Sequence, residues 1–100
     1  MNSFEQIFML VAQVPKGKVI TYKLIAQKLN IKDHRFVGFA LHRNKNPHQI
    51  PCHRVIKSNG ELAEGYAFGG KQKQREMLKH EGVLFTSNYR VNLNQCLFMI

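Results

Sequence analysis

A cysteine, a histidine and an arginine follow one another directly at Cys52, His53 and Arg54. The thiolate is the reactive form of cysteine, and cationic neighbours lower the pKa of a free thiol from its usual value of about 8.5. Pro51 has a fixed φ and restricts the residue before it, so we expect a rigid turn to present the thiol. These residue types indicate a nucleophilic cysteine beside a basic group. The alternative is that Cys52 is a small buried apolar residue.

The elements that must position this motif begin with a helix predicted from Ser3 to about Val14, in which Ser3 and Gln6 match a capping box. A proline and a glycine follow directly and prevent its continuation. The apolar stripe of this helix is best interpreted as core, and the Val19–Ile20 segment after it is expected to be extended.

Two further helices are predicted before the motif. Thr21 is expected to cap a helix that ends near Asn30, and Asp33 to cap a third helix that ends at Arg43. The residues at helical spacing are Tyr22, Ile25, Ala26 and Leu29 in one helix, and Phe36, Val37, Ala40 and Leu41 in the other. A short turn between two short helices, the second of them basic, is typical of a helix-turn-helix. Many core helix pairs share this pattern, so the assignment depends on charge.

After the motif, the residue pattern predicts a strand, a turn, a glycine-rich loop and a fourth helix. In chain order these are 55–56, 58–60, 65–70 and Lys71–His80, with Gly82 ending the helix. The tail, residues 83–100, contains strand-compatible residues without clear alternation, and neither it nor Cys96 receives a role. We therefore expect a single domain over residues 1–100, mainly α, which is a small winged-helix-like helix-turn-helix domain with a short β element.

The net charge of the chain is +9, because fifteen Lys and Arg face six Asp and Glu. This excess is largest around the motif: between Lys32 and Lys57 there are six basic residues and one acidic residue, Asp33. A charge run is often only a solvated face. Here it surrounds the proposed thiol, so we expect a surface that binds a polyanion such as nucleic acid.

The two cysteines do not form a disulfide framework of the kind that small secreted domains use. The N-terminus has no basic signal region, and no apolar run approaches the length of a membrane span. We expect an intracellular protein, cytoplasmic or nuclear if eukaryotic, with no membrane partner. A zinc site is not expected, because its candidate ligands lack the usual spacing; they are Cys52, His53, His80 and Cys96.

The sequence Ile50-Pro51-Cys52-His53-Arg54-Val55 is preceded by Asn44 and followed by Gly65-Tyr66 and Gly69-Gly70. In this context it resembles the active-site signature of the O6-alkylguanine-DNA alkyltransferases, and the resemblance extends from about Phe4 to Gly82. It implies a monomer without cofactor or metal that binds the minor groove of double-stranded DNA. It also implies one transfer per molecule, in which the cysteine sulfur takes the alkyl group from O6-alkylguanine, or from O4-alkylthymine.

The resemblance also implies roles for the neighbours of Cys52. His53 would be the base and act on the thiol through water, because adjacent residues on an extended chain point in opposite directions. Glu81 would orient His53, as in hydrolase triads. An acid at a helix C-terminus is mildly unfavourable, which indicates a compensating contact, although a solvated Glu81 would also be tolerated. Asn44 would tie the helix-turn-helix to the active-site turn; otherwise it is a plain helix cap.

By the same resemblance, Tyr22 and Arg35 would act in base flipping: Arg35 would fill the space left by the flipped base, and Tyr22 would support the flip and donate a proton to the guanine. Their plainer alternatives are a half-buried core ring and a phosphate contact. The residues implied for the base pocket are Tyr66, Ala67, Phe68 and Gly69.

The chain departs from the family pattern in two places. Ala67 and Phe68 stand where a serine commonly follows the tyrosine, and Lys45 stands where a proline commonly follows the asparagine. The range of alkyl groups is therefore not set by the resemblance. Many relatives also carry an extra N-terminal domain, whereas this chain resembles the catalytic domain alone.

Two other functions remain open. Alkyltransferase-like proteins share this fold, replace the cysteine (commonly with tryptophan), and pass alkylated guanine to another repair pathway. The short chain and the loop at residues 65–70 favour this class, and Cys52 argues against it. A helix-turn-helix regulator is the second alternative, and in such a protein Cys52 would be idle.

Overall fold

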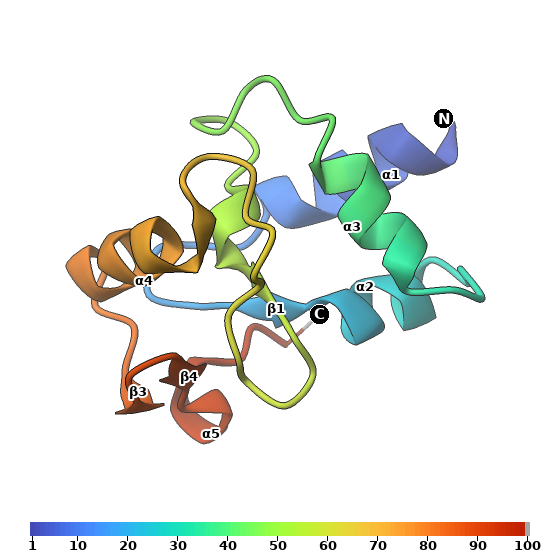
Figure 1. The fold of residues 1–100 in the computed structure, drawn as a ribbon. Helices are drawn as coiled ribbons and strands as arrows, with labels where there is room; N and C mark the ends of the chain where they lie inside the picture. The colour runs from blue at the N-terminus through green and yellow to red at the C-terminus, as the bar shows by residue number, and fades with distance from the viewer. Residues whose placement is uncertain (100) are drawn as a thin grey trace.

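A computed structural model describes residues 1–99 of the chain (Figure 1). Within that range none of the helices is long and apolar enough to cross a bilayer. The elements are α1 (Ser3–Ala12), β1 (Ile20–Thr21), α2 (Tyr22–Lys28), α3 (Arg35–Leu41), the 3-10 helix η1 (Cys52–Arg54), β2 (Val55–Ile56), α4 (Gly70–His80), β3 (Phe85–Ser87), β4 (Arg90–Val91) and α5 (Leu93–Cys96). The predicted mainly α fold, built on a helix-turn-helix, is confirmed.

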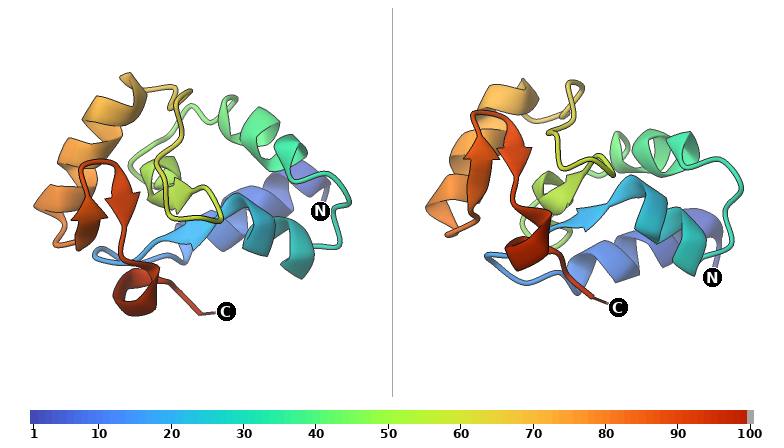
Figure 2. Two further views of the ribbon diagram at one scale, coloured as in Figure 1. Left: turned by 60° about the horizontal axis from the view of Figure 1, so that its bottom comes forward. Right: turned by 90° about the horizontal axis from the view of Figure 1, so that it is seen from below.

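The three N-terminal helices lie on one side of the molecule, and α4 with the β3–β4 hairpin lies on the other (Figures 1 and 2). Between them, β1 and β2 pair in parallel, with Ile20 opposite Val55 and Thr21 opposite Ile56. Because the pairing is parallel, the C-terminal ends of both strands lie together. One end leads into α2 and the other into the turn at residues 57–60, so these segments are neighbours in space.

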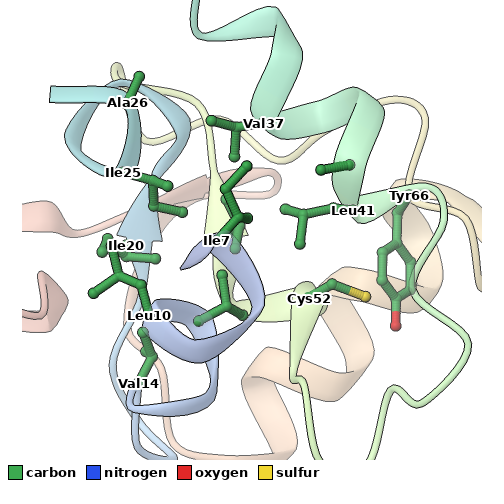
Figure 3. Close-up of a cluster of buried hydrophobic side chains, with 13 residues drawn as sticks. Ile7, Leu10, Val14, Ile20, Ile25, Ala26, Val37, Leu41, Cys52 and Tyr66 are labelled. Carbon is green, nitrogen blue, oxygen red and sulfur yellow. The ribbon is translucent and has the colours of Figure 1, made fainter. Parts of the chain in front are cut away.

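The first hydrophobic core fills the space between α1, α2 and α3 and extends to Cys52 (Figure 3). Its fully buried members come from all three helices and from both parallel strands; they are Ile7, Val11, Ile20, Ile25, Val37, Ala40 and Val55. The apolar stripes expected to face the core do so. This packing fixes the position of η1, because Cys52 is itself part of the core.

The tail, for which the sequence predicts no structure or role, closes a second hydrophobic core. Val83, Val91 and Cys96 pack against Ile56 and Leu78 there. The backbone of Val19 also pairs with the tail, since its N–H donates to the carbonyl of Cys96 at 2.8 Å. The tail therefore covers the outer face of the strands, and the two cysteines lie in different cores.

The helix ends follow local signals with small differences. Thr21 caps α2 as predicted, its hydroxyl accepting from the Leu24 N–H at 3.1 Å. The capping box of α1 is formed by Asn2 and Glu5, so the predicted Ser3–Gln6 pair is wrong by one residue. An asparagine is as good an N-cap as a serine, and both pairs have the required spacing.

The third helix is shorter than the predicted range of Asp33 to Arg43. Hydrogen bonds three residues apart form at both ends, such as that from the Arg43 N–H to the Ala40 carbonyl at 3.0 Å, so the terminal turns tighten into 3-10 geometry. Helix α4 matches its prediction and ends in a Schellman motif. Gly82 has φ +92°, and the N–H of Val83 donates to the Leu78 carbonyl at 3.0 Å.

A glutamine joins α4 to the motif. Gln74 is 0% exposed, and its amide donates to the carbonyls of His53 at 2.9 Å and Val55 at 3.1 Å. Its side-chain oxygen accepts from the Ala63 N–H at 3.2 Å. The side chain thus satisfies three buried backbone groups in three different segments, which makes it a structural residue of the site.

We predict that Gln74→Leu lowers the free energy of unfolding by about 3 kcal/mol, because unsatisfied buried polar groups each cost about 1–3 kcal/mol. Urea denaturation measures this change. Gln72→Leu, an exposed position on the same helix, is the matched control and should stay within about 0.5 kcal/mol of the wild-type protein. Equal effects of the two substitutions would show that the bonds of Gln74 contribute nothing specific.

Candidate functional site

The thiol is presented by two consecutive tight turns. Pro51 has φ −76° and ψ 72°, and the Cys52 N–H donates to the Ile50 carbonyl at 2.7 Å, which is an inverse γ-turn. The Arg54 N–H then donates to the Pro51 carbonyl at 2.9 Å and begins η1. The expected rigid turn is present, but the assumption of an extended chain at Cys52 and His53 is wrong, since both lie in this 3-10 turn.

Cys52 is 6% exposed, and its sulfur faces the ring of Tyr66 (Figure 3). A cavity of about 20 Å³ lies beside it, which is room for about one water molecule, since about 10–15 Å³ is enough to hold one. Burial raises the pKa of the Cys52 thiol, and a hydrogen bond with Asn44 partly opposes this. The prediction that neighbouring cations lower this pKa is therefore wrong, because Arg54 is paired elsewhere.

Arg54 is bound to Glu81, the C-cap residue of α4. The guanidinium donates from Nε to Oε1 at 2.9 Å and from Nη2 to Oε2 at 2.7 Å, and its Nη1 donates to the Val14 carbonyl at 2.7 Å. Burial acts to raise the pKa of Glu81, but the hydrogen bonds from Arg54 and His53 outweigh it and hold the pKa below its usual value. These two residues supply the compensation expected for an acid at a helix C-terminus.

His53 is buried, and its Nε2 lies 2.9 Å from Oε2 of Glu81. Burial lowers the pKa of His53; the Glu81 carboxylate opposes this, and the charge of Arg54 adds to it. We therefore assign a neutral imidazole whose Nε2–H donates to the carboxylate. The other ring nitrogen, Nδ1, is buried and has no hydrogen-bond partner among residues 1–99. It is free to accept a proton, which is what a general base requires.

Asn44 connects α3 to the turn that carries the thiol. Its side chain is buried, donates to the Ile50 carbonyl at 2.8 Å and accepts from the Asn46 N–H at 2.9 Å. The bond to Ile50 lies two residues before Cys52. The placement agrees with the connecting role implied for Asn44, and Lys45 after it is exposed.

A groove of about 660 Å³ opens next to the cavity, between α2, α3, the turn at residues 57–60 and the loop before Tyr66. The residues that line both spaces are Tyr22, Gly38, His42 and Gly65. Burial raises the pKa of Tyr22 to about 12, and the nearby Cys52 adds to this effect. Tyr22 therefore keeps its proton at neutral pH and stands between the groove and the sulfur.

Arg35 also lines the groove, at the start of α3, but its side chain is 85% exposed and bound to Asp33. Its Nη2 donates to Oδ2 of Asp33 at 2.8 Å and its Nε to Oδ1 at 3.0 Å. These hydrogen bonds lower the pKa of Asp33 to about 2. Asp33 thus holds the arginine at the rim, an ion pair that the sequence analysis did not anticipate.

The four residues expected to line the base pocket separate into two pairs. Tyr66 and Ala67 line the cavity beside Cys52. Burial raises the pKa of Tyr66 to about 12, and its hydroxyl donates to Sδ of Met77 at 3.4 Å. Phe68 is 38% exposed and packs edge-to-face on Tyr66, and Gly69 is the N-cap of α4, so both lie outside the cavity lining.

Sequence reasoning missed Gly38 and His42, which lie on the face of α3 that lines both the groove and the cavity. Their spacing contained the signal: Arg35, Gly38 and His42 are at i, i+3 and i+7, opposite the apolar stripe of that helix. The structural positions of Gln74 and of Arg54 were also missed.

Comparison with known proteins agrees with this geometry. A family model described as 6-O-methylguanine DNA methyltransferase, DNA binding domain, matches residues 2–83. The methylated-DNA–protein-cysteine methyltransferase of Candida glabrata is 44% identical over 84 residues, covering 83% of this chain and 39% of that protein. The chain spans less than half of the length of the curated relatives it matches.

Two solved structures share the fold. S. pombe Atl1 in complex with damaged DNA containing O6-carboxymethylguanine has a TM-score of 0.82 and 31% identity, covering 97% of this chain and 94% of that one. The O6-methylguanine-DNA methyltransferase from the archaeon Pyrococcus kodakaraensis has a TM-score of 0.70 and 33% identity, covering 83% of this chain and 47% of that one.

The fold and the site define a small helix-turn-helix protein in which a buried thiol stands beside a carboxylate-oriented imidazole. The chain belongs to the O6-methylguanine DNA methyltransferase family, whose members are alkylguanine DNA repair proteins.

The shared carboxylate predicts a specific pH dependence of stability. The pKa of Glu81 is lower in the folded protein than its ordinary value of 4.5, so its contribution is complete above that pH and is lost as the pH falls through the folded pKa. We expect Glu81→Gln to cost about 2 kcal/mol at neutral pH, because Arg54 loses its partner, and this deficit to shrink below about pH 4.5.

Urea denaturation of both proteins across this pH range measures the deficit. Glu76→Gln, an exposed position on α4, controls for the loss of one carboxylate and should show little deficit at any pH. A deficit for Glu81→Gln that stays constant on acidification would contradict the role given to the ionised carboxylate.

Proposed function

We propose that this chain repairs DNA by direct transfer of the alkyl group from O6 of guanine to Sγ of Cys52, once per molecule. O4-alkylthymine is a further substrate of the same chemistry. The observation that supports this most is the state of His53: a neutral imidazole next to Cys52, fixed by Glu81 through one nitrogen and free at the other. An idle cysteine in a DNA-binding domain would need no such neighbour.

In this mechanism Cys52 rests as a thiol, because burial raises its pKa. Nδ1 of His53 takes the thiol proton through a water molecule, and Glu81 stabilises the imidazolium that forms. The sulfur then attacks the alkyl carbon, the S–C bond forms as the C–O6 bond breaks, and the electron pair leaves with the guanine. Tyr22 supplies a proton to the departing base and regains one from His53, so the sum is a thioether and an intact guanine.

The groove is the proposed DNA site, with α3 entering the minor groove. Lys23, Arg35 and Lys57 line it, and the chain carries a net charge of +9 that would attract phosphates. The cavity beside Cys52 is too small for a purine, so the wall formed by Tyr22 and Tyr66 must move when a base enters. Arg35 would fill the vacated position in the duplex.

A second candidate is recognition without transfer. The fold of Atl1 matches 97% of this chain with a TM-score of 0.82, whereas that of the archaeal methyltransferase matches 83% with a TM-score of 0.70, and this favours a recognition protein. The Cys52–His53–Glu81 arrangement favours transfer, and we give it more weight because it concerns the reacting atoms. A single-use thiol also needs a reducing compartment, so we propose a cytoplasmic monomer, or a nuclear one in a eukaryote.

Mass spectrometry after incubation with duplex DNA that contains O6-methylguanine tests the proposal. We expect one methyl group on the peptide that contains Cys52, no methyl gain by Cys52→Ser, and normal gain by the control Cys96→Ser. Cys52→Ser should retain DNA affinity, because the sulfur does not contact the duplex before a base is flipped. Tight binding with unchanged mass of the wild-type protein would establish recognition instead.

The ion pair at the groove rim leads to a second prediction. If Arg35 must leave Asp33 to enter DNA, Asp33→Asn removes a competitor for its guanidinium and should raise duplex affinity modestly, by up to about fivefold. Fluorescence anisotropy measures this. Glu5→Gln, an exposed residue on α1, makes the same change in net charge away from the groove. An equal gain for both variants would mean that only net charge matters.

A further inference from the structure

His42 is the C-cap residue of α3 and lies at the boundary between the groove and the cavity, since it lines both. Its ring also closes the space over Gly65: a Cβ added to that glycine would lie 3.3 Å from Nε2 of His42. The imidazole and the loop before Tyr66 therefore form one edge of the opening that leads to the sulfur.

Among the described residues that line the cavity, His42 is the one that can carry a positive charge. The others are two tyrosines, Cys52, and four glycine or aliphatic residues. The lysines and arginines of this region line the wider groove and not the cavity. While His53 balances the thiolate, a negative charge that enters the cavity with an adduct can thus be paired by one lining side chain.

The position of His42 in the cavity lining matters for one class of alkylated guanine. In an O6-carboxymethyl adduct the carboxylate is bonded to the carbon that the sulfur attacks, so it must enter the cavity with that carbon. A carboxylate beside a developing thiolate is a pair of like charges in a poorly hydrated space, which is unfavourable unless a cation is present. An O6-methyl adduct brings no such charge.

We propose that the imidazole of His42 selects O6-carboxymethylguanine and related O6-carboxyalkyl adducts by pairing with their carboxylate; this rests on the proposed function. The step has the same balance as methyl transfer. The sulfur bonds to the CH₂ group, the bond from CH₂ to O6 breaks, and the thiol proton ends on the guanine. The carboxylate is unchanged and remains on the new thioether, beside His42.

The contribution of His42 can be separated from that of its neighbours. The titratable and charged groups around it are Tyr22 and Lys23 of α2, His34 and Arg35 at the start of α3, Cys52, Lys57, Glu64 and Tyr66. These groups, and His53 behind the thiol, are unchanged when His42 alone is substituted. A ratio of transfer rates for two adducts, measured at one pH before and after that substitution, therefore reports the pairing with His42.

The experiment compares single-turnover transfer from duplexes that carry O6-carboxymethylguanine or O6-methylguanine. We expect His42→Gln, which cannot carry a positive charge, to lower the carboxymethyl-to-methyl ratio by about fivefold or more relative to the wild-type protein at the same pH. His34→Gln, a groove histidine outside the cavity lining, is the control and should keep the wild-type ratio.

Equilibrium binding of the two duplexes to Cys52→Ser gives the corresponding carboxymethyl-to-methyl ratio of affinities. This measurement does not depend on transfer. Absence of methyl transfer by the wild-type protein overturns the proposed transfer alone, and the binding ratio then still tests His42. A ratio in His42→Gln that equals the wild-type ratio, or an equal loss in His34→Gln, overturns the assignment to His42.

Discussion

The carboxylate of Glu81 accepts hydrogen bonds from both His53 and Arg54, and Arg54 also reaches the carbonyl of Val14. Three distant segments meet in this contact: the connection after α1, the turn of η1 and the C-terminus of α4. The Schellman motif at Gly82 places the carboxylate there, and burial makes the paired arrangement strongly preferred over any other. The imidazole consequently has one defined tautomer, because its Nε2 is committed to the carboxylate.

The same architecture couples DNA binding to the sulfur over a short path. The parallel pairing of β1 and β2 brings the start of α2 next to the turn that follows β2, and the groove forms between them. Tyr22, the first residue of α2, is part of the groove wall and of the cavity wall at once. Asn44 holds the end of α3 to the backbone just before Cys52. A base that enters the groove as proposed would therefore displace side chains that also line the cavity at the sulfur.

Elements with strong local signals were predictable from the sequence. The cap at Thr21, the apolar stripes of the helices and the glycine at position 82 each act within one turn of chain, so their outcome needs no tertiary information. The partners of Arg54 and of the tail were not predictable in this way. Adjacency in the sequence predicts that Arg54 acts on Cys52, whereas its partner Glu81 is 27 residues away. Gln74 lies on the same helix face as the buried Leu78, so its burial could be predicted from spacing. The reason that a polar side chain is tolerated there, its three backbone hydrogen bonds, could not.

The enclosure of Cys52 has a consequence for how long the protein remains usable. A group that can be alkylated only once is wasted whenever peroxide or a soluble electrophile reaches it, and exposed thiolates are the form most susceptible to such loss. In this chain the sulfur is protonated and faces a space too small to admit more than a water. If the chain acts as the proposed single-use acceptor, this low intrinsic reactivity keeps the thiol intact until a DNA lesion reaches it.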